Sequence, residues 1–316
     1  MATLAQLNYA LKVLETGQFG KAADVCFVTQ PTLSQQIQKL EEEIGFTLFD
    51  RSKKPIKPTK QGKTYLDQAF VVLKESKKLE SLNYRTDGRL SGYYTLGVIP
   101  TISPFVVPLF VDEFCSKNPE VNLSIDELKT EEIVASLRTG KIDVGLLATP
   151  LLEKDLIEIP VFYEPFHLYM RAEAEFIEGK PLQVKSLDKD KVWLLQDGHC
   201  LRQQVLNFCA TEGSSGLHPN LKFQSGNLES LRFLIQNNGG FTFFPQLFVD
   251  ALPKAEQKKY IHAVTGKLPS REVSLVFHKN DFRKEMVEAI KKSIQKNLPP
   301  TVFKDKPSGE MKVLPI

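Results

Sequence analysis

The chain has 316 residues, of which 42% are hydrophobic and 25% are charged, with a formal net charge of +3. These values are typical of a globular protein with two or three folded units. The sequence has no apolar run of about 18 residues, no secretory signal, and too few cysteines for a disulfide framework. We therefore expect a cytoplasmic protein, not bound to a membrane, whose thiols are reduced at rest.

Residues 1–62 predict a DNA-binding unit of the winged helix-turn-helix kind. An amphipathic helix ends at Gly17, and a short helix follows near Lys21–Val25. Thr29 is a good N-cap and Pro31 is tolerated in a first turn, so a third helix is expected to begin here. Its predicted buried face consists of Leu33, Ile37, Leu40 and Ile44.

Short polar side chains gather in the first half of this third helix, and a basic cluster without acids follows at 51–63. Hydroxyls, amides and cations suit contacts with base edges and phosphates, although a solvated helix and loop would explain each feature alone. Glu41–Glu43 would repel DNA. A hairpin wing is expected between Phe46 and Gly62. The residues expected to contact DNA are Thr29, Gln30, Pro31, Thr32, Ser34, Gln35, Gln38, Arg51, Lys53 and Lys60.

A long helix is expected from Lys63 to about Tyr84, because this stretch contains neither proline nor glycine. We assign 63–87 to a linker helix. Its apolar seam suits pairing with a second copy of the chain, and comprises Leu66, Ala69, Val72, Leu73, Leu79 and Leu82.

Residues 88–298 predict an α/β domain of alternating strands and helices. Three proline residues follow Pro299, so we expect 299–316 to be a tail whose composition allows disorder. The expected strands are 94–99, 121–125, 144–148, 192–195, 240–244 and 273–277, and the expected helices are 103–117, 130–139, 200–209 and 227–237. This alternation predicts parallel sheets flanked by helices.

Cys200 is expected at the start of a helix, with His199 and Arg202 close in sequence. Free backbone amides, the helix dipole and two basic neighbours would favour its thiolate, the form that attacks peroxides and disulfides. An incidental cysteine is the plainer alternative. Cys26 is expected in a core and Cys115 near a helix end, where nothing activates it.

Cys209 falls on the apolar face of the same helix and is expected to be buried. Nine residues of helix separate the two Cα atoms by roughly 13–14 Å. A disulfide needs roughly 4.4–6.8 Å. Cys200 and Cys209 therefore cannot be joined while the helix is intact, which favours a switch over a structural crosslink.

Several motifs together resemble the LysR family of bacterial transcriptional regulators. They are Ala22-Ala23, Thr29–Ser34, Ile37–Glu41, Leu48-Phe49 with Arg51, and Thr59–Gly62. The resemblance implies a winged helix-turn-helix, pairing through the linker helix into a homodimer or homotetramer, and a regulatory domain of two α/β lobes like those of periplasmic solute-binding proteins. It implies a first lobe at 88–161 and 266–298, a second lobe at 162–265, two crossover strands, and a cleft between the lobes.

Within this family, the segment Leu195–Gln204 with Phe208-Cys209 resembles the peroxide-sensing members. Ile99–Thr101, Thr130, His218 and Leu228–Arg232 resemble them as well. The resemblance implies that Cys200 reacts with hydrogen peroxide and then forms a disulfide with Cys209. The implied peroxide pocket consists of Thr101, Thr130, His199 and Arg202. The implied partners are double-stranded promoter DNA, RNA polymerase and a glutaredoxin- or thioredoxin-type reductant, without a cofactor.

Other interpretations stay open. A LysR-type regulator that binds a small metabolite between its lobes would leave the cysteines incidental. A thiol peroxidase or disulfide oxidoreductase is disfavoured, because such an enzyme has no use for a DNA-binding unit and the chain has no Cys-x-x-Cys motif. Thr101 and Thr130 would also serve as ordinary helix N-caps. No metal site is expected, since the histidines show no ligand spacing with the cysteines.

Overall fold

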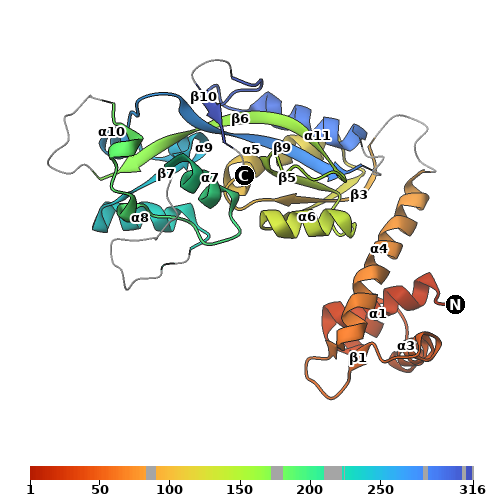
Figure 1. The fold of residues 1–316 in the computed structure, drawn as a ribbon. Helices are drawn as coiled ribbons and strands as arrows, with labels where there is room; N and C mark the ends of the chain where they lie inside the picture. The colour runs from red at the N-terminus through yellow and green to blue at the C-terminus, as the bar shows by residue number, and fades with distance from the viewer. Residues whose placement is uncertain are drawn as a thin grey trace. The chain divides into compact units, whose positions relative to one another are not determined.

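The computed structural model describes residues 1–82, 90–171, 181–209, 223, 225–279, 284–307 and 311–314. They form two compact units, Met1–Tyr93 with Thr139–Lys141, and Tyr94–Arg138 with Ile142–Ile316 (Figure 1). The predicted fold class, a winged helix-turn-helix with a long helix followed by an α/β domain, is confirmed. In the described parts of the chain, no helix combines the length and the apolar character needed to cross a bilayer.

The N-terminal unit is a helical core with a small hairpin. Its elements are α1 (Leu4–Thr16), α2 (Phe19–Val25), α3 (Gln30–Ile44), β1 (Phe49–Asp50), β2 (Lys57–Pro58) and α4 (Lys60–Leu82). Thr29 caps α3 by accepting a hydrogen bond from the Thr32 amide, as predicted. Leu33, Ile37 and Leu40 are fully buried, whereas Ile44 is only partly buried because α3 ends there, at Gly45.

The first half of α4 belongs to the core of this unit. Leu66 and Ala69 are 1% and 3% exposed and pack in the same cluster as the buried residues of α3. Their prediction as a seam for a second chain is therefore wrong. Val72 is 41% exposed and remains accessible for contact with a second chain. The side chains of Leu79 and Leu82 lie outside the described residues.

Phe27 lies in the turn between α2 and α3, at a position that glycine usually occupies. The Val28 amide donates to the Ala23 carbonyl (3.1 Å) and the Phe27 amide to the Asp24 carbonyl (3.2 Å). This is the Schellman pattern, whose C′ residue adopts a left-handed conformation. Phe27 has a φ of 54° and a side chain that is 96% exposed. The backbone strain of this residue is thus not offset by packing within the chain.

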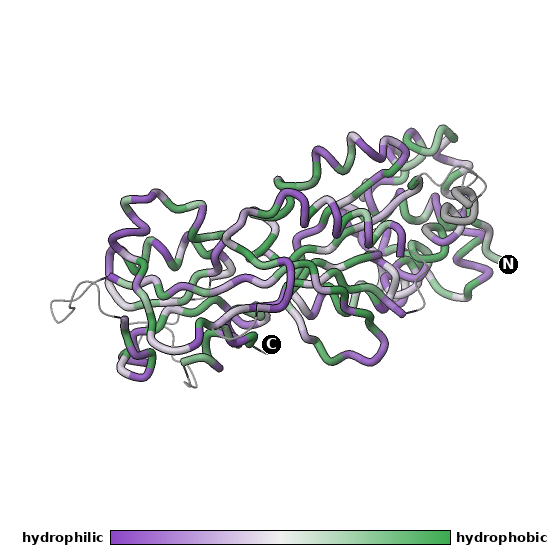
Figure 2. Tube along the Cα trace, turned by 90° about the horizontal axis from the view of Figure 1, so that it is seen from above, coloured by the Kyte–Doolittle hydropathy of each residue, from purple (hydrophilic) through white to green (hydrophobic). Residues whose placement is uncertain are grey.

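The second unit, Tyr94–Arg138 with Ile142–Ile316, corresponds to the expected regulatory domain and is called the regulatory unit below. It is built on one mixed sheet of eight strands in the order β4-β3-β5-β9-β6-β7, with β10 beside β9 and β8 beside β6. The strands are β3 (Gly92–Val98), β4 (Val121–Glu127), β5 (Val144–Thr149), β6 (Leu156–Met170), β7 (Phe241–Pro245), β8 (Ile261–His262), β9 (Leu268–His278) and β10 (Met311–Val313). Every residue of β5 is buried, and hydrophobic residues colour much of the middle of the unit in Figure 2.

The α-helices of this unit are α5 (Ser103–Lys117), α6 (Thr130–Arg138), α7 (Cys200–Cys209), α8 (Leu228–Asn238), α9 (Gln246–Ala251), α10 (Lys254–Tyr260) and α11 (Lys284–Asn297). Two short 3₁₀ turns, Val184–Ser186 and Lys189–Lys191, precede α7. Figure 1 shows α11 and α6 on opposite sides of the strands that they cover. The helices predicted at 103–117 and 200–209 have the predicted bounds.

Two long antiparallel strands run through the whole regulatory unit. β6 pairs with β9 from Leu156↔His278 to Pro165↔Ser270, and its last residues pair with β7 (Figure 1). β5 also pairs with β9 in antiparallel sense. The prediction of parallel sheets is therefore only partly right, because the two strands that cross between the lobes run in opposite directions.

Two further expectations for this unit differ from the structure. Residues 192–195 do not form a strand: Val192 makes one isolated bridge with Phe241, after which the chain leads to α7. The described part of 299–316 is not a free tail. β10 pairs in parallel with β9, and Leu314, 2% exposed, donates its amide to the Ser270 carbonyl (2.8 Å). The burial of a leucine explains why this segment packs despite its prolines.

Replacing Phe27 by glycine is expected to stabilise the N-terminal unit by about 0.5–1 kcal/mol, because glycine adopts the left-handed conformation without steric cost. Amide hydrogen exchange in α2 and α3 of the full chain measures this change. Faster exchange in the variant would show that the exposed ring has a stabilising contact that offsets its strain.

Candidate functional site

Helix α7 places its two cysteines at opposite ends, with Cys200 as its first residue and Cys209 as its last. Both are free thiols and are 5% and 6% exposed. At 1.5 Å per residue their Cα atoms are about 13.5 Å apart, well beyond disulfide distance. The predicted separation is confirmed. A bond between the two sulfurs requires α7 to unwind.

The charge that faces Cys200 comes from Arg271 on β9. Burial raises the pKa of the Cys200 thiol above its ordinary value, and the Arg271 guanidinium, the Thr130 hydroxyl and the backbone amides of the first turn oppose this rise without cancelling it. The expected preference for the thiolate is therefore not met in the reduced structure, because burial outweighs the groups that favour it. We expected His199 and Arg202 to supply the positive charge. In the structure the largest cationic contribution comes instead from Arg271, a residue about 70 positions further along the chain.

Arg271 is held in a fully buried ion pair. Its Nε and Nη2 donate to Glu164 Oε2 at 2.8 and 2.7 Å, and both side chains are 0% exposed. Glu164 lies directly opposite on β6, as the register partner of Arg271. Arg271 Nη1 also donates to Thr101 Oγ1 (3.0 Å), and Nη2 to the Thr101 carbonyl (3.2 Å). One guanidinium thus connects both crossover strands with the turn after β3.

Arg202 and His199 shape the loop ahead of Cys200. Arg202 donates from Nη1 to the Leu195 carbonyl and from Nε to Asp197 Oδ1, each at 2.9 Å. Burial, reinforced by the Lys129 ammonium, lowers the pKa of His199, so its imidazole is neutral at pH 7. The Arg202 guanidinium is thus directed to the loop and paired with Asp197, and burial disfavours a charged His199.

Thr101 and Thr130 do not act as N-caps. Helix α5 has no side-chain cap, and the Thr101 hydroxyl instead accepts from Arg271. Thr130 is the first residue of α6, and its hydroxyl faces the Cys200 thiol without a nitrogen or oxygen partner among the described residues. The Thr101 hydroxyl therefore contacts Arg271, and the Thr130 hydroxyl faces the Cys200 sulfur directly.

Two further residues at this site escaped the sequence analysis besides Arg271 and Glu164. Gln204 lies one helical turn after Cys200, is 0% exposed, and neither polar end has a partner in the described structure. Residues four apart lie next to each other on one face of a helix, so the spacing of Gln204 from Cys200 indicates that the two side chains are neighbours. Gly226 lets the His199 ring approach, since a Cβ there would lie 3.0 Å from His199 Nε2. His218, singled out in the sequence, lies outside the described residues.

Cys209 and Cys26 have fewer groups that oppose the effect of burial than Cys200 has. Burial raises the pKa of the Cys209 thiol to about 12, and Lys189 opposes this only weakly. Burial also raises the pKa of Cys26, which packs at the edge of the N-terminal core. Cys115 is exposed. Cys209 is therefore an inert thiol as long as α7 is folded.

In the reduced protein at about pH 8, we expect iodoacetamide to alkylate Cys209 at least about 100-fold more slowly than exposed Cys115, since only a thiolate reacts. Peptide mass spectrometry of timed samples measures both rates, and denatured protein serves as the control in which the rates converge. Comparable rates in the folded protein would contradict the assigned burial of Cys209.

The residues predicted to contact DNA form an accessible surface on the N-terminal unit. Nine of the ten have exposed side chains, and Ser34 is partly exposed. The Gln30 side chain packs over Gly20, where a Cβ would lie 3.4 Å from its Oε1. The hairpin of β1 and β2 forms the expected wing. Contacts of these residues with DNA remain a prediction.

Glu41 has a structural role that local sequence patterns do not indicate. It is 8% exposed, and its Oε1 accepts the amides of Leu48 (2.6 Å) and Phe49 (3.3 Å). Its Oε2 accepts from Arg51 (2.9 Å), whose guanidinium also lies over the Phe19 ring. The ion pair with Arg51 thus offsets the negative charge of Glu41, which reduces its repulsion of DNA. Through the same ion pair, Arg51 connects α3 to the wing.

Replacing Glu41 by alanine is expected to destabilise the N-terminal unit by about 2–3 kcal/mol, because two buried amides lose their acceptor. Glu42→Ala, at an exposed neighbour, is the matched control. Chemical denaturation followed by helical circular dichroism compares the two variants, and equal stability would show that the Glu41 contacts do not hold the wing.

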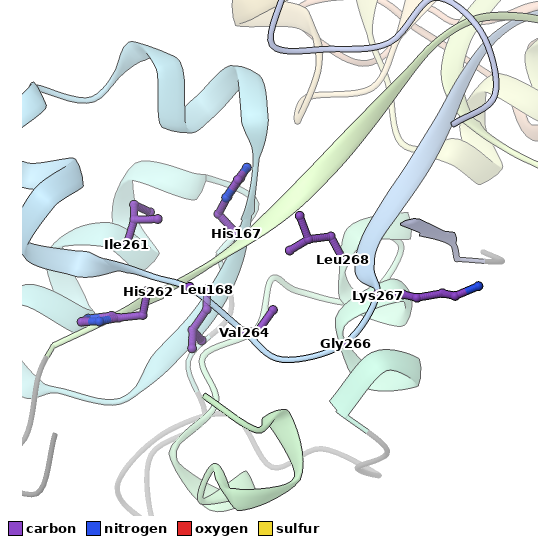
Figure 3. Close-up of a pocket in the computed structure, with 9 residues that line it drawn as sticks. His167, Leu168, Ile261, His262, Val264, Gly266, Lys267 and Leu268 are labelled. Atoms are coloured by element: carbon purple, nitrogen blue, oxygen red, sulfur yellow. The ribbon is translucent and has the colours of Figure 1, made fainter. Parts of the chain in front are cut away.

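A separate cavity of about 750 Å³ lies along β6, β8 and the start of β9. It contains none of the predicted pocket residues. Figure 3 shows that the His167, His262 and Lys267 side chains point in different directions. His167 contacts Gln246 and His262 contacts the Met170 carbonyl. This cavity shows no convergent set of polar groups.

Comparisons with known proteins cover both units. Residues 4–63 match the family model described as bacterial regulatory helix-turn-helix protein, lysR family, and residues 87–299 match the LysR substrate binding domain. The chain is 34% identical to the hydrogen peroxide-inducible genes activator of Haemophilus influenzae, over 87% of this chain and 90% of that protein.

Solved structures are similar as well. A cysteine-to-aspartate variant of full-length OxyR from Pseudomonas aeruginosa has a TM-score of 0.73 at 28% identity, covering 94% of this chain and 99% of that one. A hydrogen peroxide-bound cysteine mutant of OxyR from Corynebacterium glutamicum has a TM-score of 0.58 at 27% identity, covering 94% of each chain.

Proposed function

The chain belongs to the LysR family of bacterial transcriptional regulators, and we propose that it senses hydrogen peroxide through Cys200 and Cys209. Oxidation joins the two cysteines, remodels the homodimer or homotetramer on promoter DNA, and controls antioxidant genes through RNA polymerase. The protein acts in the cytoplasm and is re-reduced by a glutaredoxin- or thioredoxin-type dithiol. Relatives named for hydrogen peroxide support this proposal.

The single observation that carries the proposal is the convergence of Arg271 and Thr130 on the Cys200 thiol. Both favour the thiolate against a burial that otherwise disfavours it. The unpartnered Thr130 hydroxyl and the free end of Gln204 leave hydrogen-bonding capacity for a small polar molecule such as peroxide.

The chemistry takes place in two steps. The Cys200 thiolate attacks one peroxide oxygen, the O–O bond breaks, and the departing oxygen takes the bonding pair and a proton to leave as water. Cys200 is then a sulfenic acid. The Cys209 thiol displaces its hydroxyl to form the disulfide and a second water. Thr101, Thr130, His199 and Arg202 are the residues proposed to organise the peroxide and the loop around it.

Formation of the disulfide, the second step, requires a conformational change in α7. Cys209 must leave the apolar cluster that it shares with Leu201 and Val205, because its sulfur cannot reach Cys200 in the intact helix. Loss of α7 changes the surface of the regulatory unit. In a family that pairs its subunits, such a change shifts the spacing of the DNA-binding units.

Mass spectrometry of reduced protein treated with one equivalent of hydrogen peroxide tests the proposal. We expect a peptide linked through Cys200 and Cys209, or a Cys200 sulfenate that precedes it. If neither forms, the redox function is wrong, and the interpretation as a metabolite-responsive LysR regulator takes its place.

Cys200→Ser is expected to abolish this oxidation and leave DNA binding by the reduced protein unchanged, because the substitution conserves the size of the side chain and lies in the regulatory unit. Electrophoretic mobility shifts with promoter DNA measure the binding. Loss of binding in the reduced variant would indicate that Cys200 has a structural role.

A further inference from the structure

The loop ahead of Cys200 is held from two directions. On one side Arg202, on α7 itself, binds the Leu195 carbonyl and the Asp197 carboxylate. On the other side Lys129, which directly precedes α6, donates from Nζ to the Asp197 carbonyl (3.2 Å). Lys129 and Asp197 are 68 positions apart in sequence and belong to the two different predicted lobes.

The position of Lys129 is fixed by the start of α6. Its amide donates to Glu132 Oε2 (2.8 Å), and its carbonyl accepts from the Ile133 amide (2.9 Å). The next residue is Thr130, whose hydroxyl faces the Cys200 thiol. The same helix start therefore contacts both the reactive sulfur and the loop that leads to it.

The aliphatic part of Lys129 packs closely on Gly198. Gly198 has a φ of 87°, and a Cβ at this position would lie 3.1 Å from Lys129 Cδ. A left-handed glycine allows the loop to pass under the lysine without collision. The contact thus combines a charge-assisted hydrogen bond with van der Waals packing, and it covers the two residues before His199.

We propose that Lys129 is a positioning residue that latches the Asp197-Gly198 turn closed in the reduced state. Cys200 is only 5% exposed, so a large reagent reaches its sulfur only when the turn opens. The first turn of α7 follows directly, so the latch must also release before α7 unwinds. This second consequence rests on the proposed peroxide function, whereas the first does not.

Lys129→Met tests the latch, because methionine keeps most of the aliphatic chain and removes the ammonium. A bulky maleimide is expected to label Cys200 about fivefold faster in this variant, the effect of losing one partly solvated hydrogen bond from a charged donor. Lys129→Arg should restore the slow rate. Lys185→Met, at an exposed lysine of another segment, controls for the loss of charge.

The second measurement follows the rate at which a Cys200 sulfenate converts to the disulfide after a pulse of peroxide. We expect a similar acceleration in Lys129→Met. Unchanged maleimide labelling would overturn the latch. Faster labelling with no disulfide in any variant would support the latch and overturn the proposed redox function, so the two failures are distinguishable.

Discussion

The buried ion pair between Glu164 and Arg271 is the interaction on which the rest of the regulatory unit depends. Both side chains are fully buried, and removing either would leave an uncompensated charge that costs about 3–5 kcal/mol. The pair fixes the register of β6 against β9, the two strands that cross the unit. Glu164 also accepts the Leu247 amide at the start of α9, and Arg271 binds Thr101 after β3. A constraint needed for folding thereby positions the charge that faces Cys200.

The residues that set the environment of the Cys200 sulfur differ from those that must move when a disulfide forms. Arg271, Thr101 and Thr130 belong to rigid elements or to the turns that directly join them, so the environment of the sulfur is preorganised. Cys209 and the loop at Asp197 belong to α7 and to the segment that leads into it. In the proposed mechanism, peroxide reacts within the first set of residues, and formation of the disulfide must disrupt the second set. Because α7 is ten residues long with a cysteine at each end, the proposed disulfide would convert a local oxidation into a conformational change.

Local patterns in the sequence were sufficient for helices such as α5 and α7 and for the place of Cys200, whereas the short helices α9 and α10 were not predicted. The bounds of α5 and α7 followed from apolar spacing and from breakers such as Asn118-Pro119. Arg271 was missed because its partner lies 107 positions away, and no local pattern shows which charged strand residue will be buried. Leu66 and Ala69 have the spacing of a dimer seam and of a core face alike, so only the tertiary structure decides between them. The packing of Leu314 was likewise hidden, because its contacts come from β9 rather than from neighbours in sequence.

Hydrogen exchange of the α7 amides, compared before and after stoichiometric oxidation, tests most directly whether the disulfide is a conformational signal. In the reduced protein the amides of residues 204–209 should be protected by the helix. With the Cys200–Cys209 bond in place, our expectation is that this protection is lost while the amides of β6 and β9 keep theirs. A disulfide formed with α7 still protected would contradict it.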